Sequence, residues 1–591
     1  MRGRIPRKSE ASHWGGFAAG RIYLRTNHPG YRKRMSWSRW RAVVGAIFCV
    51  LLVASSPLTA QTKAPRANEM AIDHHSIRIR IDHEKKTLFG DCEIRFCGVE
   101  RKKPTPITFL FLDGELEKVE INGAACSQYT YGAIPGLTLE QTKLYDLKQL
   151  TVTIPASPPF PVVRVVYRDT DFYGAATNPE DNKPFSLGQI REEDAFSSHI
   201  YYYPFVQYAG NRADIRITTD LPGSFAISSG ALVEVTEDGN RRTYHYCTDW
   251  RSGILPYPFA IAKYEKLEKT ASDKKTKLQI FFYPEDRAFA EQRMPVLENV
   301  FSTYLGLFGE YPFPKLAIVE TDLRDGNIGL AAQSVIMLSR KVWFGVKLDA
   351  TDPALTNSPL LVLADEVNHQ WNAYKVGSPN YLAEGISRYV DSLFAETLGG
   401  LETLKEHMGQ TRASYFSLVD EQGVEDKPIT DPSVYPALYF IKGALTLHML
   451  RGMYGYDTFK KALRRYFTVC EGKVTILDDL RASFEYATGE ELTWFFDQWF
   501  KRAGWPKVKV NWSSKSAGQD RYVVELSVCQ EQTGLFRLDR VPIQIDFHDG
   551  FQGVTFVCVN AAKEQTIVIE VDREPKEVRF DPEGWVLRQL K

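Results

Sequence analysis

The fold is decided by residues 360–396, which read LLVLADEVNHQWNAYKVGSPNYLAEGISRYVDSLFAE. In the first half of this stretch, apolar residues recur at i, i+4, i+7 and i+11, the spacing of one face of an α-helix. These residues are Leu360, Ala364, Val367 and Trp371. A second helical pattern begins near Tyr381. We therefore expect two consecutive helices, the first with an apolar face packed on a core.

The same stretch carries ionisable residues that helical geometry brings together. Asp365 and His369 are four residues apart and share a face of the first helix, with Glu366 beside them. Glu384 stands near the start of the second helix, in the sequence Leu-Ala-Glu-Gly. Buried carboxylates facing an imidazole are costly unless a metal ion or protons compensate them. The pattern indicates a metal or catalytic site, although D-E-x-x-H alone also fits a solvated helix face.

The composition describes a large folded protein. The chain has 591 residues, of which 44% are hydrophobic and 13% aromatic, and its mean hydropathy is −0.29. These values predict several globular domains and exclude a disordered chain or a polytopic membrane protein. Residues 61–591 hold 62 Lys and Arg against 72 Asp and Glu. A mildly acidic body argues against a nucleic-acid footprint.

The basic excess lies in residues 1–60, which hold 11 basic residues and one acidic residue. Arg39 and Arg41 precede the apolar run 42–54, AVVGAIFCVLLVA, and small residues follow as far as Ala60. This order is typical of a secretory signal peptide and predicts cleavage after Ala60. The protein is therefore expected to be exported, to the periplasm or beyond. An uncleaved signal anchor is the alternative, but 13 residues are few for a bilayer span.

Three patterns follow one another after the leader. Alternating apolar residues and turn residues from about 71 to 267 predict a large antiparallel β domain. One helix is expected over 289–308, and helical spacing dominates from about 358 to 503. Its segments are 358–374, 381–397, 401–418, 437–454, 456–469 and 490–502. Alternation returns from Lys507 and predicts a terminal β module.

The stretch 360–396 resembles the zinc motif of the gluzincin aminopeptidases, the family of membrane alanyl aminopeptidase and leukotriene-hydrolase-type enzymes. Their H-E-x-x-H motif is followed on the next helix by a Glu in an N-E-G or S-E-G context. Three further blocks resemble family segments and occur in the expected order: 301–316 (FSTYLGLFGEYPFPKL), 441–455 (IKGALTLHMLRGMYG) and 491–506 (ELTWFFDQWFKRAGWP). The resemblance covers nearly the whole chain after the leader.

The resemblance implies an α+β multidomain fold. After residues 1–60, the upstream extension plus signal peptide, four regions are expected. They are an N-terminal antiparallel β domain over 68–267, a thermolysin-like α/β catalytic-type domain over 268–400, a helical domain over 401–505 and a C-terminal β module over 506–591.

The resemblance also implies roles for the ionisable residues. His369 and Glu384 correspond to the second and third zinc ligands, and Glu366 to the general base. Where the family has its first histidine ligand, this chain has Asp365. Fourteen residues separate His369 from Glu384, fewer than the eighteen of the best-known members, and a shorter connection can still bring Glu384 over His369.

Two further positions depart from the family. Its G-A-M-E-N-type loop supplies a Glu for the substrate amine, whereas 326–334 reads GNIGLAAQS and contains no Glu. Its substrate-binding positions fall on Gly329, Leu330, Ala331 and Ala332. The family's Y-x-K-G motif supplies an oxyanion-binding tyrosine, and here the register reads Phe440-Ile-Lys-Gly. Tyr439 is adjacent, but one residue along a helix points about 100° away.

These departures favour an exported pseudo-peptidase that binds a peptide or a protein partner in the interdomain cleft. Zinc is expected to bind weakly or not at all, because a neutral nitrogen ligand is lost at Asp365. Two carboxylates around one imidazole should also make any zinc-bound water less acidic. Loss of an oxyanion donor costs about 10²–10³ in rate. The alternative is an active zinc metallopeptidase with Asp365, His369 and Glu384 as ligands and Glu366 as general base. A structural subunit is a third hypothesis. No nucleic acid is expected as a partner, nor a membrane span after signal cleavage.

Other polar or aromatic features are interpreted as structural. His74 and His75 are expected to be a solvated pair near the mature N-terminus. The aromatic segment 201–205, YYYPF, and the aromatic residues of 494–500 are expected to pack in cores.

Overall fold

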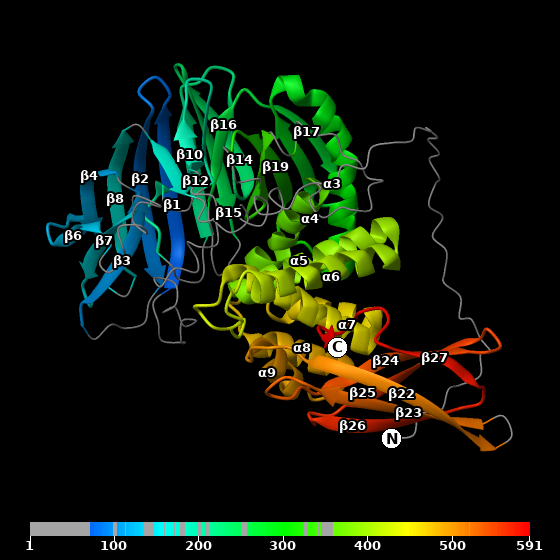
Figure 1. Cartoon of the computed structure of the whole chain (residues 1–591). Helices are drawn as coiled ribbons and strands as arrows, with labels where there is room; N and C mark the ends of the chain where they lie inside the picture. Colours follow the sequence, from blue (N-terminus) through cyan, green and yellow to red (C-terminus); the bar gives the residue numbers. More distant parts are fainter. Residues whose placement is uncertain are drawn as a thin grey trace. The chain divides into compact units, whose positions relative to one another are not determined.

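Figure 1 shows the computed structural model of the chain. It describes residues 71–97, 103–112, 114–134, 147–158, 160–170, 172–177, 184–198, 202–206, 212–249, 257–323, 329–340, 343, 359–518 and 521–591. The predicted signal peptide and residues 326–328 of the GNIGLAAQS loop lie outside this set. One compact unit ends at Ala503, and a second begins at Gly504 and extends to Lys591.

The N-terminal region is built from three sheets. The largest has the order β14 (Ala231–Asp238), β15 (Arg241–Thr248), β12 (Arg212–Thr219), β1 (Ala71–Asp82), β2 (Thr87–Cys97), β8 (Val162–Thr170), β4 (Glu115–Ile121), β5 (Ala124–Ala125). A five-stranded sheet has the order β13 (Phe225–Ser228), β16 (Phe259–Ala262), β11 (Asp194–Ser197), β10 (Pro184–Ile190), β9 (Tyr173–Thr177). The third consists of β3 (Thr105–Leu112), β7 (Leu147–Ile154) and β6 (Tyr129–Ala133). The pairing is antiparallel except between β1 and β12, which run parallel.

Strand β1 illustrates why the alternating sequence forms this sheet. Ile77, Ile79 and Ile81 are buried, whereas Arg78 between them is exposed. Successive side chains of a strand point to opposite faces, so the IRIRI run buries one face and leaves the other to solvent.

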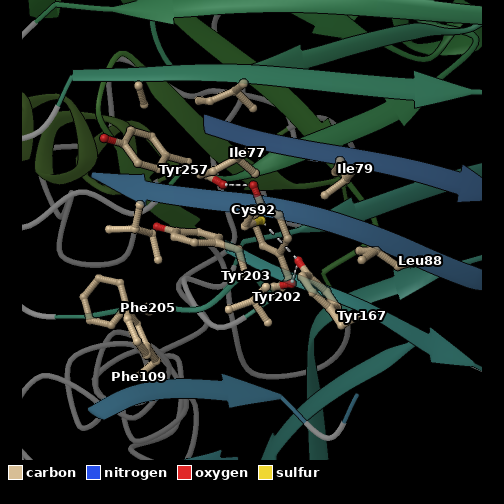
Figure 2. Close-up of a cluster of buried hydrophobic side chains, with 14 of the residues drawn as sticks. Ile77, Ile79, Leu88, Cys92, Phe109, Tyr167, Tyr202, Tyr203, Phe205 and Tyr257 are labelled. Atoms are coloured by element: carbon tan, nitrogen blue, oxygen red, sulfur yellow. Dashed lines mark hydrogen bonds between the residues drawn. The ribbon is translucent and has the colours of Figure 1, made fainter. Parts of the chain in front are cut away.

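The core of this region is rich in tyrosine. Figure 2 shows Tyr167 donating its hydroxyl proton to the carbonyl of Tyr202, and Tyr202 donating to the carbonyl of Tyr257, each at 2.6 Å. Tyr202, Tyr203 and Phe205 are buried here, so these residues of the YYYPF segment do pack in the core.

The expectation of a solvated His74–His75 pair is wrong for His75. Its ring is buried and contacts the rings of Tyr203 and Tyr257 edge-on, at centroid distances of 6.1 Å. Alternation in β1 turns His75 to the inner face, and burial lowers its pKa to about 3. Its neighbour His74 faces the other way and bonds Asp214 through Nε2 at 2.8 Å.

The catalytic-type region is a second five-stranded sheet with one long helix against it. The strand order is β17 (Glu265–Thr270), β18 (Lys277–Phe282), β19 (Lys315–Thr321), β21 (Val335–Ser339), β20 (Gly329–Ala332). A short turn of helix, η2 (Pro284–Asp286), leads into α3 (Arg287–Phe308), which contacts β17 and β18. The predicted boundary between residues 267 and 268 falls inside β17.

The helices that follow are α4 (Pro359–His369), the π-helical turn η4 (Gln370–Lys375), α5 (Asn380–Gly399), α6 (Leu401–Phe416), the π-helical turn η5 (Ser417–Glu421), α7 (Pro436–Val469), α8 (Leu477–Thr488) and α9 (Thr493–Phe500). Helix α7 is interrupted at Gly455, whose φ of 80° separates the two helices expected there. Helix α8 was not expected from the sequence pattern.

The C-terminal unit consists of two sheets. One has the order β26 (Glu564–Val571), β23 (Arg521–Gln530), β22 (Lys507–Gly518), β28 (Gln589–Leu590), and the other β25 (Gln552–Val559), β24 (Leu538–Phe547), β27 (Pro575–Phe580). Val524 and Leu526 of β23 and Ile543 and Ile545 of β24 are fully buried, as period-2 alternation requires.

The predicted fold class is confirmed: an N-terminal β region, a catalytic-type α/β region, helices and C-terminal β sheets follow one another along the chain. Within the ranges given above, no helix has the length and apolar character needed to cross a bilayer.

Candidate functional site

The site begins on α4, which is buried on every side. Its apolar residues Leu360, Ala364 and Val367 pack inward as expected. Asp365 and Glu366 are also buried, with 6% and 7% of their surface exposed. A solvated helix face for the D-E-x-x-H residues is therefore excluded by their burial.

Two asparagines on α4 and η4 tie this segment to α5. The Nδ2 group of Asn368 donates to the Ser387 hydroxyl at 2.5 Å, and that of Asn372 donates to the carbonyl of Ala383. Asn368 and Asn372 are one helical turn apart, so they fix both the spacing and the register of the two helices. Glu384 follows directly after Ala383 and is carried to the face of α4 by these bonds.

The structure brings Asp365, His369 and Glu384 together. His369 Nε2 lies 3.6 Å from Asp365 Oδ2 and 3.8 Å from Glu384 Oε2. Glu384 has no exposed surface, and neither of its carboxyl oxygens has a hydrogen-bond partner among the residues described. The three residues that the motif spacing identified therefore lie close together in the structure. Their role as metal ligands stays a prediction.

The charges of this cluster perturb one another. Burial would lower the pKa of His369, but the surrounding carboxylates, Glu384 foremost, raise it to about 10. Burial is the main cause that raises the pKa of Glu366 and of Glu384 above the ordinary range, and the charge of Asp365 adds to it in both. These raised pKa values favour the protonated forms of Glu366, His369 and Glu384, and protonation offsets the buried negative charge.

The residues do not fit a preformed tetrahedral zinc centre. Two ligands with bonds of about 2.0–2.1 Å would lie about 3.3 Å apart at the tetrahedral angle, less than either separation measured from His369. In the part of the chain that the structure describes, no three His, Cys, Asp or Glu side chains converge closely enough to hold a metal ion. One imidazole and two carboxylates also provide a single nitrogen ligand, whereas the family's two histidines and one glutamate provide two.

The four residues to which the resemblance assigns substrate binding, Gly329–Ala332, form β20, which lies against Glu366. The backbone N–H of Ala331 donates to the Glu366 carboxylate, and the carbonyl of Ala331 accepts from the Tyr374 hydroxyl at 2.6 Å. An added Cβ at Gly329 would lie 2.9 Å from Glu366 Oε1 and 2.9 Å from Leu338 Cδ2, so a larger residue would require one or both of these side chains to shift. Leu330 and Ala332 complete the strand, and none of the four residues carries a carboxylate.

Gln370 holds the turn between β20 and β21, a role that motif reasoning missed. Its Nε2 donates to the Ala332 carbonyl at 2.9 Å, and its Oε1 accepts from the backbone N–H of Ser334 at 2.7 Å. Gln370 opens η4, where Val376 N–H bonds back to the Trp371 carbonyl five residues earlier. The extra residue of the π-helical turn breaks the 3.6-residue period, so periodicity alone could not place this side chain.

Phe440 stands near the start of α7 and is half-buried. Its ring stacks on that of Tyr439, with centroids 5.3 Å apart and planes 19° from parallel. The charge of Glu384 is among the causes that raise the Tyr439 pKa, after burial. Tyr439 therefore lies within electrostatic reach of Glu384, and it carries the single hydroxyl of this aromatic pair.

Asp391 is a fifth ionisable residue of the cluster that the motif did not reveal. It lies on α5 seven residues after Glu384, two helical turns along the same face. It is buried; burial first and the charge of Asp365 second raise its pKa well above the ordinary range. The spacing of seven residues from Glu384 is the sequence signal that could have found it.

Comparison with known proteins agrees with this arrangement. Residues 292–499 match the model of the Peptidase family M1 domain. The chain is 24% identical to aminopeptidase N of Caulobacter vibrioides over 338 residues, which cover 53% of this chain and 37% of that protein. It is 22% identical to aminopeptidase M1 of Arabidopsis thaliana over 361 residues, 54% of this chain and 39% of that protein. The chain thus spans less than two fifths of the length of each of these two relatives.

A solved structure shares the fold. The crystal structure of Legionella pneumophila aminopeptidase A in complex with aspartic acid matches with a TM-score of 0.67 at 13% identity, covering 90% of this chain and 60% of that one. The matched family segment includes the helix pair that carries Asp365, His369 and Glu384, and the solved structure shares the overall fold. A peptidase family M1 domain over residues 292–499, aminopeptidase relatives and an aminopeptidase fold together support the chain as a gluzincin aminopeptidase family member.

Proposed function

We propose that the protein is an exported pseudo-peptidase, which binds a peptide or a protein segment through its aminopeptidase fold without cleaving it at a family-like rate. One observation carries the proposal. The residues that build the scaffold, Asn368, Asn372 and Gly385 among them, make close contacts, whereas the residues at three chemical positions of the family differ.

The first chemical position is Asp365, where an oxygen donor replaces an imidazole nitrogen. The second is β20, where Ala332 and its neighbours offer no carboxylate for a substrate amine. The third is Phe440, which has no hydroxyl for an oxyanion. Loss of a positioned donor costs about 10²–10³ in rate, and loss of substrate orientation costs more, so together they leave little of the family's activity.

The edge of β20 supports the same conclusion. β20 is the last strand in its sheet, and an extended peptide would pair with such an edge through backbone groups. Ala331 already uses its N–H on Glu366 and its carbonyl on Tyr374. A peptide that reached Glu366 along this edge would first have to displace these internal bonds.

The test compares the chain of residues 61–591 with Asp365→His, Phe440→Tyr and the double variant. Zinc stoichiometry and kcat/KM on amino-acid anilides are measured for each. The unmodified chain is expected to hold little zinc and to hydrolyse at no family-like rate. Asp365→His should restore zinc binding, because His369 and Glu384 then complete a two-histidine, one-glutamate set, yet should restore little turnover.

The double variant should gain more rate than the sum of the single changes, because an oxyanion donor helps only once a bound nucleophile exists. Stoichiometric zinc with brisk hydrolysis in the unmodified chain would overturn the proposal in favour of an Asp-ligated zinc peptidase. Peptide binding is measured separately by the fluorescence anisotropy of labelled peptides. A chain that neither binds nor cleaves them would favour a structural subunit instead.

A further inference from the structure

Strand β25 forms one edge of its sheet in the C-terminal unit. One side of β25 pairs with β24, and among the residues that the structure describes no strand pairs with its other side. Phe556 of β25 lies opposite Pro542 of β24. Proline has no N–H, and the Pro542 carbonyl accepts from the N–H of Asp581, on the β27 side. Pro542 and Phe556 therefore exchange no hydrogen bonds, and the N–H and carbonyl of Phe556 point to the free side.

The same direction holds for every second residue of β25. N–H and carbonyl groups alternate between the two sides of an antiparallel strand, so those of residues 552, 554 and 558 also point to the free side. The side chain of Gln565 ends this edge. Its Oε1 accepts from the N–H of Asn560 at 2.7 Å, and its Nε2 donates to the Cys558 carbonyl at 3.1 Å. The free edge thus runs from Gln552 to Cys558.

The outward face of this edge is apolar. Phe556 has 60% of its surface exposed and Val554 has 52%, and Cys558 is exposed beside them. The intervening residues Gly553 and Val557 are buried, so the exposed side chains form one stripe along the strand. Single exposed apolar residues are ordinary, whereas this stripe lies beside backbone groups that a further strand could pair with.

The edge also lacks the devices that keep strand edges apart, which are charged residues and proline. β25 reads QGVTFVCV and has neither. The opposite edge of the same sheet, β27, reads PKEVRF, and the edge strand β26 of the other sheet reads EQTIVIEV. Antiparallel pairing of two copies of β26 about Ile567 would place Glu564 opposite Glu570. Pairing of two copies of β25 places no like charges opposite each other.

We propose that β25 pairs antiparallel with β25 of a second copy of this chain, about a two-fold axis at Thr555. Gln552 then lies opposite the partner's Cys558, and Val554 lies opposite the partner's Phe556. This register pairs the whole free edge, because the Cys558 carbonyl has a second lone pair besides the one that Gln565 uses. It also sets a β-branched side chain beside an aromatic ring on both sides of the axis, a favourable cross-strand pair. The inference concerns the C-terminal unit and is independent of the proposed function.

The first test is the oligomeric state of the chain of residues 61–591, which contains every described residue. One pair of short strands is a small interface, so we expect a dimer dissociation constant of about 1 µM or weaker. Sedimentation under reducing conditions from about 1 to 300 µM should therefore show monomer at the low end and dimer at the high end. A chain that stays monomeric throughout this range would overturn the proposal.

A charge placed on the edge locates the interface. Phe556→Glu should weaken dimerisation at least about tenfold, because pairing would bury one unpaired carboxylate from each copy. Phe160→Glu changes a phenylalanine of nearly equal exposure, 58%, and should leave the dimer unchanged. Equal dissociation constants of these two variants would overturn the assignment of the interface to β25.

A disulfide tests the register. In the proposed pair the Cα atoms of residue 552 and of the partner's Cys558 lie about 5.5 Å apart, a separation that a disulfide spans. Gln552→Cys should therefore give a covalent dimer on mild oxidation, and Cys558→Ser in the same chain should abolish it. Absence of the covalent dimer, or its persistence after Cys558→Ser, would overturn the register about Thr555.

Discussion

Substitution of Gly443 by alanine should loosen the crossing of α5 and α7 that carries Glu384. An added Cβ at Gly443 would lie 2.8 Å from the Cα atom of Gly385, and the contact is with backbone on a packed helix rather than with a flexible side chain. A normal contact needs about 3.4 Å or more, so the helices would have to separate by about 0.6 Å or more. Overpacking of this kind costs about 1–3 kcal/mol.

Alanine also gains about 1 kcal/mol over glycine inside a helix, so the crossing must be tested against a matched control. Gly409 in α6 provides it, because an added Cβ there would meet no atom within 4 Å. Gly409→Ala should therefore be stabilising by about 1 kcal/mol, and Gly443→Ala should be less stable than this control by about 1–3 kcal/mol.

The assay is hydrogen exchange of the amides of α5 and α7, which reads the local opening free energy. A difference of 1–3 kcal/mol corresponds to exchange faster by about 5- to 150-fold in Gly443→Ala than in Gly409→Ala. Equal protection of α5 and α7 in the two variants would refute the tight crossing. It would also refute the inference that the close approach of Gly385 and Gly443 determines how α5 crosses α7.

Three further predictions concern other parts of the chain. The pKa of His75 is about 3 when folded, below the unfolded value of about 6.5, so its contribution to stability is present above pH 6.5 and is lost as pH falls. Between pH 8 and pH 5 the loss of stability amounts to about 2 kcal/mol, measured by hydrogen exchange of the amides of β1 and β2. His75→Leu should remove this pH dependence, and the same pH dependence in the variant would contradict the burial argument. Gln370→Ala should destabilise the β20–β21 turn by about 1–3 kcal/mol, seen as faster exchange there, whereas Gln422→Ala on the exposed surface should not. N-terminal sequencing of the exported protein should begin at Gln61, and an intact 42–54 segment would indicate a membrane anchor instead.

Local sequence pattern predicted most of the fold. Period-2 alternation in Ile77–Ile81 predicted β1, and spacing of 3.6 residues predicted α3, α4 and α5, because in these segments burial of one face agrees with the local preference. Helix α8 was missed although its buried residues Leu477, Leu480 and Phe484 follow the i, i+3, i+7 spacing of a helix face, so the signal was present in the sequence.

The candidate site was predicted in part. The i, i+4 spacing of Asp365 and His369 identified the first half of the cluster, and the motif context identified Glu384. Asp391 was missed although it stands seven residues after Glu384 on the same helix face, whereas Gln370 was missed because it reaches the site only through a π-helical turn. Contacts between residues far apart in sequence leave no local period to detect.

The sequence by itself determined which elements form, which residues could carry chemistry, and which chemical positions of the family have changed. The tertiary structure decided what surrounds those residues. It buried His75 among tyrosines, although its neighbour His74 stays partly exposed, and it left the oxygens of Glu384 without donors. The physical reason is that spacing along a chain fixes direction on a helix or strand, whereas burial, charge balance and hydrogen-bond partners come from the elements packed against it.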